Sequence, residues 1–89
     1  MAEYKAGPRK REPTRPGKIL ASALKATDLT ANSAAPRIGT SKMTLGRIIN
    51  GEAPVTTEMA LRLGRFFGNG AKLWLNMQAN YDLWHAEQK

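Results

Sequence analysis

The 89 residues suffice for one compact domain but not for two, and no apolar run approaches the roughly 18 residues that a membrane helix needs. Fourteen Lys and Arg residues against 7 Asp and Glu give a formal net charge of +7 at pH 7, which is typical of proteins that bind a polyanion such as nucleic acid. The chain has no cysteine, which excludes disulfides and thiolate-bound metals, and no signal peptide is evident, so we expect a cytoplasmic protein.

Residues 1–16 differ in composition from the rest of the chain. They contain three prolines, Gly7 and five basic residues, which are Lys5, Arg9, Lys10, Arg11 and Arg15. Proline and glycine at this density prevent a regular helix, and no apolar periodicity is present. We therefore expect a flexible basic arm over 1–16 and one domain over 17–89, which alone carries nine basic against five acidic residues.

The first helix is predicted from the apolar spacing of Ile19, Leu20, Ala23 and Leu24, directly after Pro16, a residue suited to a first helical turn.

A second, short helix is expected to begin after Thr30, a suitable N-cap, and to end near 38–39. Pro36 falls inside it. An interior proline removes one backbone hydrogen bond and crowds the preceding turn, at a cost of about 3 kcal/mol or more. This helix therefore either begins late and is short, or is kinked at the proline.

The third helix is expected to begin after Ser41 and to stop at Asn50-Gly51, because glycine readily adopts the left-handed conformation of a C-terminal cap. Its inner face is apolar and consists of Leu45, Ile48 and Ile49.

Two more helices complete an all-α fold class with five helices and no strand. Thr56 caps the fourth, and Glu58 suits the positive end of its dipole. Its expected buried face comprises Ala60, Leu63, Gly64 and Phe67. After the break at 68–70, the fifth helix has one apolar side, comprising Leu73, Trp74, Met77, Tyr81 and Trp84.

Only Gly39 and Thr40 separate the second and third helices. A tight turn containing glycine fixes two helices at a steep angle, as in a helix-turn-helix, whose second helix meets base edges with its N-terminal part. The candidate DNA-binding residues are Thr30, Ser41, Lys42, Met43, Thr44, Gly46 and Arg47.

These candidates suit contacts with double-stranded DNA. Arg47 can fork onto O6 and N7 of guanine, Met43 can touch a thymine methyl, and Ser41 and Thr44 can bond a phosphate or a base edge. The alternative is a solvated helix face, which the surrounding turn and caps disfavour.

Several short motifs occur in a characteristic order: PGKIL at 16–20, SKMTL at 41–45, RIING at 47–51, MALRL at 59–63, WLNMQ at 74–78 and YDL at 81–83. This series resembles the HigA/VapI-type antitoxins, a branch of the lambda-repressor-like (XRE) helix-turn-helix family. The resemblance covers most of the chain, from about residue 13 to residue 84.

The resemblance implies a five-helix, lambda-repressor-like homodimer that represses its own operon at a palindromic operator and is nucleoid-associated when bound to DNA. It also implies neutralisation of a HigB-type toxin, a RelE-like ribonuclease that cleaves translated messenger RNA. The basic arm then follows the minor groove or phosphates, contacts the toxin, or is an inert tail.

Two residues depart from the family pattern. Ala31 stands where relatives commonly carry a glutamine that touches DNA, and Ala34 stands where a larger aliphatic residue is usual. Together with Pro36, they motivate an alternative function, a toxin-neutralising protein-interaction module with weak or lost operator binding.

The aromatic residues of the fifth helix exceed what a small core absorbs. We expect Trp74 and Met77 in the core and a dimer interface at Tyr81, Leu83 and Trp84, with the core as the alternative place for these three.

His85 is the only histidine, and with no cysteine and few acids nearby it cannot complete an ordinary metal site. The sequence also lacks an acid–base cluster and a phosphate-binding loop. We therefore expect no enzyme activity, no cofactor and no metal.

Overall fold

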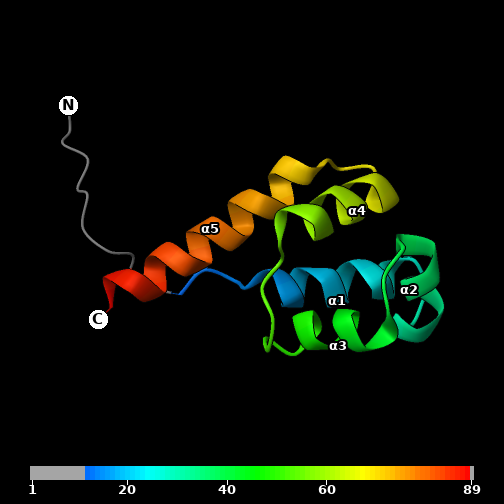
Figure 1. Cartoon of the computed structure of the whole chain (residues 1–89). Helices are drawn as coiled ribbons and strands as arrows, with labels where there is room; N and C mark the ends of the chain where they lie inside the picture. Colours follow the sequence, from blue (N-terminus) through cyan, green and yellow to red (C-terminus); the bar gives the residue numbers. More distant parts are fainter. Residues whose placement is uncertain (1–11, 89) are drawn as a thin grey trace.

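The computed structural model describes residues 12–88, and this part of the chain consists of five α-helices and no strand. The helices are α1 (Pro16–Ala26), α2 (Ala31–Ile38), α3 (Lys42–Ile49), α4 (Thr57–Phe67) and α5 (Ala71–Glu87). In Figure 1, α3 lies along one side of α1, α4 lies on the other side, and α2 closes the end between them. The predicted all-α, five-helix fold is confirmed.

Most of the predicted basic arm, residues 1–11, lies outside the described residues. The remaining part, which we had also assigned to the arm, lies against the domain. Arg15 donates to the backbone oxygen of Ile49 at 2.9 Å, and Glu12 lies 2.6 Å from the ring of His85. Pro16 is buried and is the first residue of α1. This position suits proline, because its fixed φ fits a first helical turn and its missing N–H is not needed there.

The core joins all five helices. Its largest fully buried side chains are Trp74, Leu20, Leu45 and Leu63. The other buried apolar residues are Leu24, Ala34, Ala35, Ile38, Ile48, Val55, Met59 and Ala60. No polar or charged side chain among residues 12–88 is buried, so burial of apolar surface dominates the stability of this fold.

α1 and α3 approach each other closely at Gly17. A Cβ at this position would collide with the backbone oxygen of Ile48, so only glycine allows this crossing. The crossing places α3 directly against α1, which thereby supports the short third helix.

α2 begins at Ala31, directly after the predicted cap Thr30, and continues through Pro36, so the late start, one of the two alternatives considered for this helix, is excluded. Thr30 and Ser33 form a capping box, with N···O distances of 3.1 Å in both directions, which the sequence analysis missed because serine takes the place of the usual glutamate. Pro36 is exposed, and so is Asn32, the residue whose backbone carbonyl loses its helical partner to the proline.

α5 buries only one residue completely, Trp74, whose indole N–H donates to Asn69 at 3.0 Å. Met77, which we expect in the core, is half-buried and packs against it. Leu73 is 44% exposed and does not share the buried side of α5. α5 packs mainly along α4 with its first half, and its second half extends past the helical body (Figure 1). No helix within residues 12–88 is both long and apolar enough to cross a bilayer.

Candidate nucleic-acid interface

The turn between α2 and α3 is compact, and its first two backbone N–H groups are both hydrogen-bonded. Gly39 ends α2 in the left-handed region, with a φ of 95°, which favours glycine. The N–H groups of Gly39 and Thr40 both donate to the backbone oxygen of Ala35 at 2.9 Å. Ser41 then caps α3 by accepting from the N–H of Thr44 at 3.1 Å. The predicted helix-turn-helix boundaries are therefore confirmed.

α3 has a buried face and an exposed face. Leu45 and Ile48 are buried, and Ile49 is half-buried against the core, as the sequence predicts. The structure brings most of the predicted DNA-binding side chains together on the other side, where Lys42, Met43, Thr44 and Arg47 are exposed and Gly46 is half-exposed. Met43 is 73% exposed, which is high for so large an apolar side chain.

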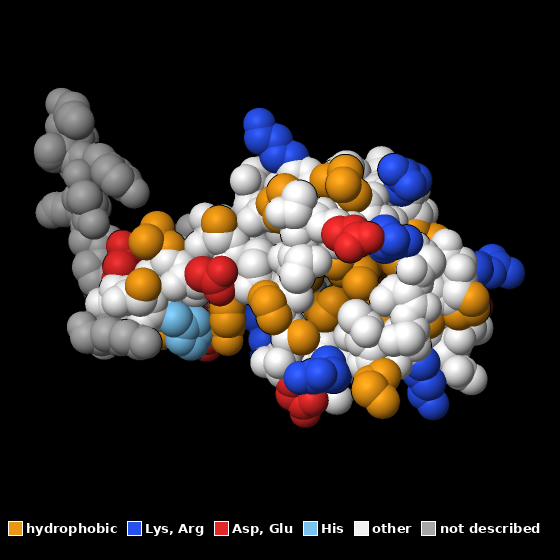
Figure 2. Space-filling view, in the orientation of Figure 1, with side chains coloured by type: hydrophobic (Ala, Val, Ile, Leu, Met, Phe, Trp, Pro, Cys, Tyr) orange, Lys and Arg blue, Asp and Glu red, His pale blue; other side chains and the backbone are white. Residues whose placement is uncertain are grey.

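The two basic side chains of α3 are available to a partner. Neither Lys42 nor Arg47 forms an ion pair with any residue of the 12–88 segment, whereas Arg62 of α4 pairs with Glu58. Figure 2 shows Lys and Arg side chains around the end of the body that α2, α3 and α4 form.

The hydroxyl groups at the start of α3 are not equivalent. Ser41 accepts from the Thr44 N–H and donates its own proton to the Thr44 hydroxyl at 2.9 Å. The proton of the Ser41 hydroxyl is therefore used inside the cap. The Thr44 hydroxyl keeps its own proton, so Thr44 is the hydroxyl of this pair that can donate to a partner.

Thr30 is positioned differently from the other candidates. It caps α2 rather than α3, and its hydroxyl is engaged with Ser33 in the capping box. The next residue, Ala31, is half-buried against the core and offers no polar group at the start of α2. The start of α2 is thus built for capping, and polar side chains for a partner are concentrated on α3.

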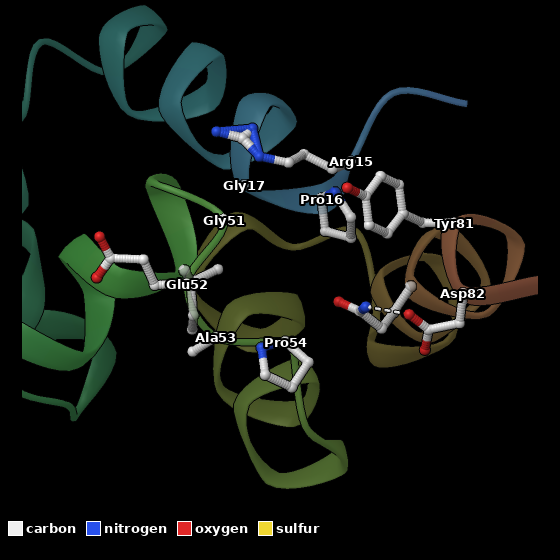
Figure 3. Close-up of a pocket in the computed structure, with 11 residues that line it drawn as sticks. Arg15, Pro16, Gly17, Gly51, Glu52, Ala53, Pro54, Tyr81 and Asp82 are labelled. Carbon is white, nitrogen blue, oxygen red and sulfur yellow. Dashed lines mark hydrogen bonds between the residues drawn. The ribbon is translucent and has the colours of Figure 1, made fainter. Parts of the chain in front are cut away.

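Away from the exposed face of α3, a hollow with a volume of about 220 Å³ lies where the start of α1, the loop after α3 and α5 meet (Figure 3). Arg15 and Tyr81 line it from different elements. Gln78, which also lines it, accepts from the N–H of Val55 at 2.8 Å and donates to Asp82 at 2.9 Å. No group of three metal-ligating residues occurs in the described part of the chain.

The end of α5 carries the three predicted dimer residues. Leu83 is 59% exposed, and Tyr81 and Trp84 are half-buried. The rings of Tyr81 and Trp84 flank His85, with centroid distances of 4.4 and 5.1 Å. Burial is the largest effect that raises the pKa of Tyr81, followed by the negative charge of Glu12 and a hydrogen bond to it.

The contact of Glu12 with His85 and Tyr81 was missed in the sequence, because 73 residues separate Glu12 from His85 and no local pattern signals the pair.

Comparison with known proteins places this geometry in a family. The model of the Helix-turn-helix family matches residues 20–73. A relative, the uncharacterized HTH-type transcriptional regulator YbaQ of Escherichia coli (strain K12), is 40% identical over 78 residues, which cover 86% of this chain and 69% of that protein.

Two solved structures share the fold over most of the chain. An addiction module antidote protein of a HigA family from Coxiella burnetii matches with a TM-score of 0.84 and 37% identity, over 88% of this chain and 86% of that chain. The Pseudomonas aeruginosa antitoxin HigA, solved with the higBA promoter, matches with a TM-score of 0.80 and 33% identity, over 83% and 82%. This chain therefore belongs to the helix-turn-helix family of DNA-binding regulators, in the branch that contains the HigA antitoxins.

Proposed function

We propose that this chain is a sequence-specific repressor and antitoxin that binds a palindromic operator as a homodimer. The observation that carries the proposal is the exposed face of α3, which consists of Lys42, Met43, Thr44 and Arg47. Within the 12–88 segment neither Lys42 nor Arg47 forms an ion pair, and Thr44 bonds only to its cap, Ser41. In this geometry the exposed face of α3 enters the major groove, and α2 braces it.

Each exposed side chain of α3 has a distinct role in the proposal. Arg47 reads a guanine by two hydrogen bonds, and Met43 contacts a thymine methyl. Lys42 and Thr44 bind the phosphate backbone at the N-terminal end of α3, where the helix dipole also attracts an anion. Ser41 and Gly46 serve indirectly. Ser41 caps α3, and Gly46 has no side chain, so the backbone of α3 can approach the groove closely.

A palindromic operator requires two copies related by a two-fold axis. We place the dimer interface at Tyr81, Leu83 and Trp84, because they belong to the last part of α5, which extends past the helical body (Figure 1), and because Leu83 is 59% exposed there. In such dimers the two recognition helices read half-sites about 34–36 Å apart.

The antitoxin role is supported by the names of the matched structures, an antidote protein of a HigA family and the antitoxin HigA. The proposed partner is a HigB-type toxin, a RelE-like enzyme that cleaves messenger RNA. Co-expression with the product of the neighbouring reading frame tests this role: growth should resume only when this chain is present, and the two proteins should purify together.

A mobility shift tests the operator role. The probe is the DNA directly upstream of the chain's own reading frame, compared with a scrambled duplex of equal length at physiological salt. Preferential binding of the upstream duplex is expected, and equal binding of both duplexes contradicts the proposal.

Equal binding would instead favour the alternative, a toxin-neutralising module with weak operator binding. That alternative rests on Ala31, which leaves the first position of α2 without a polar side chain.

A further inference from the structure

Two arginines from outside the helix-turn-helix bind its backbone on either side of the second helix, one at the turn before it and one at its last residue. Arg62 belongs to α4 and reaches the turn before α3, and Arg15 precedes α1 and reaches the last turn of α3. Each donates to a backbone carbonyl oxygen. Neither arginine belongs to the exposed face of α3, so the proposed DNA contacts do not account for them.

Arg62 fixes the turn. One nitrogen of its guanidinium donates to the backbone oxygen of Gly39 at 3.0 Å, and the other donates to Glu58 at 2.8 Å. The group also covers the Cα of Gly39, because a Cβ at this position would lie 2.6 Å from Arg62 Nη1. Glu58 lies one turn earlier on α4 and holds the guanidinium in this orientation.

Arg15 fixes the opposite end. Its Nη2 donates to the backbone oxygen of Ile49 at 2.9 Å, where the negative end of the α3 dipole favours a cation. Its side chain passes over Gly51, whose Cβ, if present, would lie 2.7 Å from Arg15 Nε. Figure 3 shows Arg15 beside Gly51 and Tyr81, so the same side chain links the end of α3 to the hollow beside α5.

We propose that Arg15 and Arg62 are positioning residues that set the angle of α3 for base reading without binding DNA themselves. The proposal rests on the proposed DNA-binding function. A bidentate base contact tolerates displacements of about 0.5 Å and about 10–20°, so a short helix needs both its last residue and the turn before it held in place. α3 has only 8 residues, and charge-assisted hydrogen bonds are among the stronger ones available for this purpose.

The first experiment compares Arg15→Ala and Arg62→Ala with two matched controls. Arg65→Ala removes the same charge from α4, and Lys18→Ala removes a charge from the first turn of α1; neither side chain contacts the ends of α3. Affinities are measured for the parent's upstream duplex and for a scrambled duplex over a range of salt concentrations. Melting temperatures are recorded for every variant.

The expected result separates positioning from phosphate binding. Each test variant should bind the upstream duplex about tenfold more weakly, with unchanged affinity for the scrambled duplex and an unchanged salt slope. The controls should leave the ratio of the two affinities unchanged. Arg15→Lys and Arg62→Lys each keep a positively charged N–H donor but lose the planar fork, and should restore part of the ratio. A loss on both duplexes with a salt slope lower by about one would show a phosphate contact and overturn the proposal.

A second experiment needs no DNA. Amide hydrogen exchange reports the turn through Thr40, whose N–H donates to Ala35, and the far end through Glu52, whose N–H donates to Arg47 at 2.7 Å. Arg62→Ala should accelerate exchange at Thr40 but not at Glu52, and Arg15→Ala should do the reverse, with core amides such as that of Leu63 unchanged. Unaltered exchange at both ends overturns the proposal. If the parent protein shows no preference for its upstream DNA, the proposed function fails, while the exchange data still decide whether Arg15 and Arg62 hold α3 in position.

Discussion

Arg47 is the side chain of α3 best suited to distinguish one base from another, because its planar guanidinium presents two parallel donors and no described residue pairs with it. Replacing Arg47 by Ala should cost about 1–3 kcal/mol of discrimination at a single base position. Affinities for operator duplexes that differ at one base pair measure this loss. Unchanged discrimination at every position would mean that Arg47 does not read a base.

Lys42 provides the matched comparison. An ammonium group binds phosphate as a point charge, so Lys42→Ala should weaken all duplexes similarly and lower the slope of log affinity against log salt by about one. A base-specific effect of Lys42→Ala would contradict the assignment of its role.

Tyr81 should titrate late. Burial, the charge of Glu12 and the hydrogen bond to Glu12 raise the pKa of Tyr81 above its ordinary value of 10.0 in the folded state. The contribution of the tyrosine to stability is therefore complete at neutral pH and is lost as the pH rises through its folded pKa. A carbon-13 tyrosine NMR titration, with Tyr81→Phe to assign the signal, measures the shift. Glu12→Gln should lower the pKa toward the ordinary value, and no change would contradict the contact.

At the scale of the elements, α2 combines a strong start with a weak interior. The capping box of Thr30 and Ser33 fixes its first turn, whereas Pro36 removes a backbone hydrogen bond from its second. Pro36 is exposed, so its ring itself is not needed for the core.

Pro36→Ala should therefore raise the free energy of unfolding by about 2 kcal/mol, since the helical cost of proline, about 3 kcal/mol, exceeds the roughly 1 kcal/mol by which it restricts the unfolded chain. Denaturant unfolding measures the difference. Thr30→Ala serves as the opposite control and should lower stability by about 1 kcal/mol. Equal stability of Pro36→Ala and the parent would mean that the helix pays no penalty at this position.

The same elements show what a sequence can predict. Caps such as Ser41 and Thr56 act through neighbours three residues away, so local spacing predicted where α3 and α4 begin. The prediction that Leu73 lies on the buried side of α5 was wrong, because that side depends on where α4 packs against α5. The bonds of Arg15 and Arg62 join segments 34 and 23 residues apart, and no periodicity indicates them.

At the scale of the whole molecule, the described chain divides into a packed helical body and the end of α5, which leaves it (Figure 1). The body supports α3 with its core, and the end of α5 lies against the segment that contains Glu12 and Arg15. The proposed DNA face and the proposed dimer face are thus separate, which allows both to be occupied at once.

This separation makes the dimer testable with one matched pair of substitutions. Leu83 is 59% exposed on α5 and Leu61 is 50% exposed on α4, so replacing either by Glu introduces a charge at a comparably open position. Leu83→Glu should shift the protein to a monomer in analytical ultracentrifugation, because a charge buried at a two-fold interface faces its own copy. It should also weaken binding to the full operator while leaving the affinity for an isolated half-site unchanged. Leu61→Glu should change neither property, and a dimer that persists in Leu83→Glu but not in Leu61→Glu would move the interface from α5 to α4.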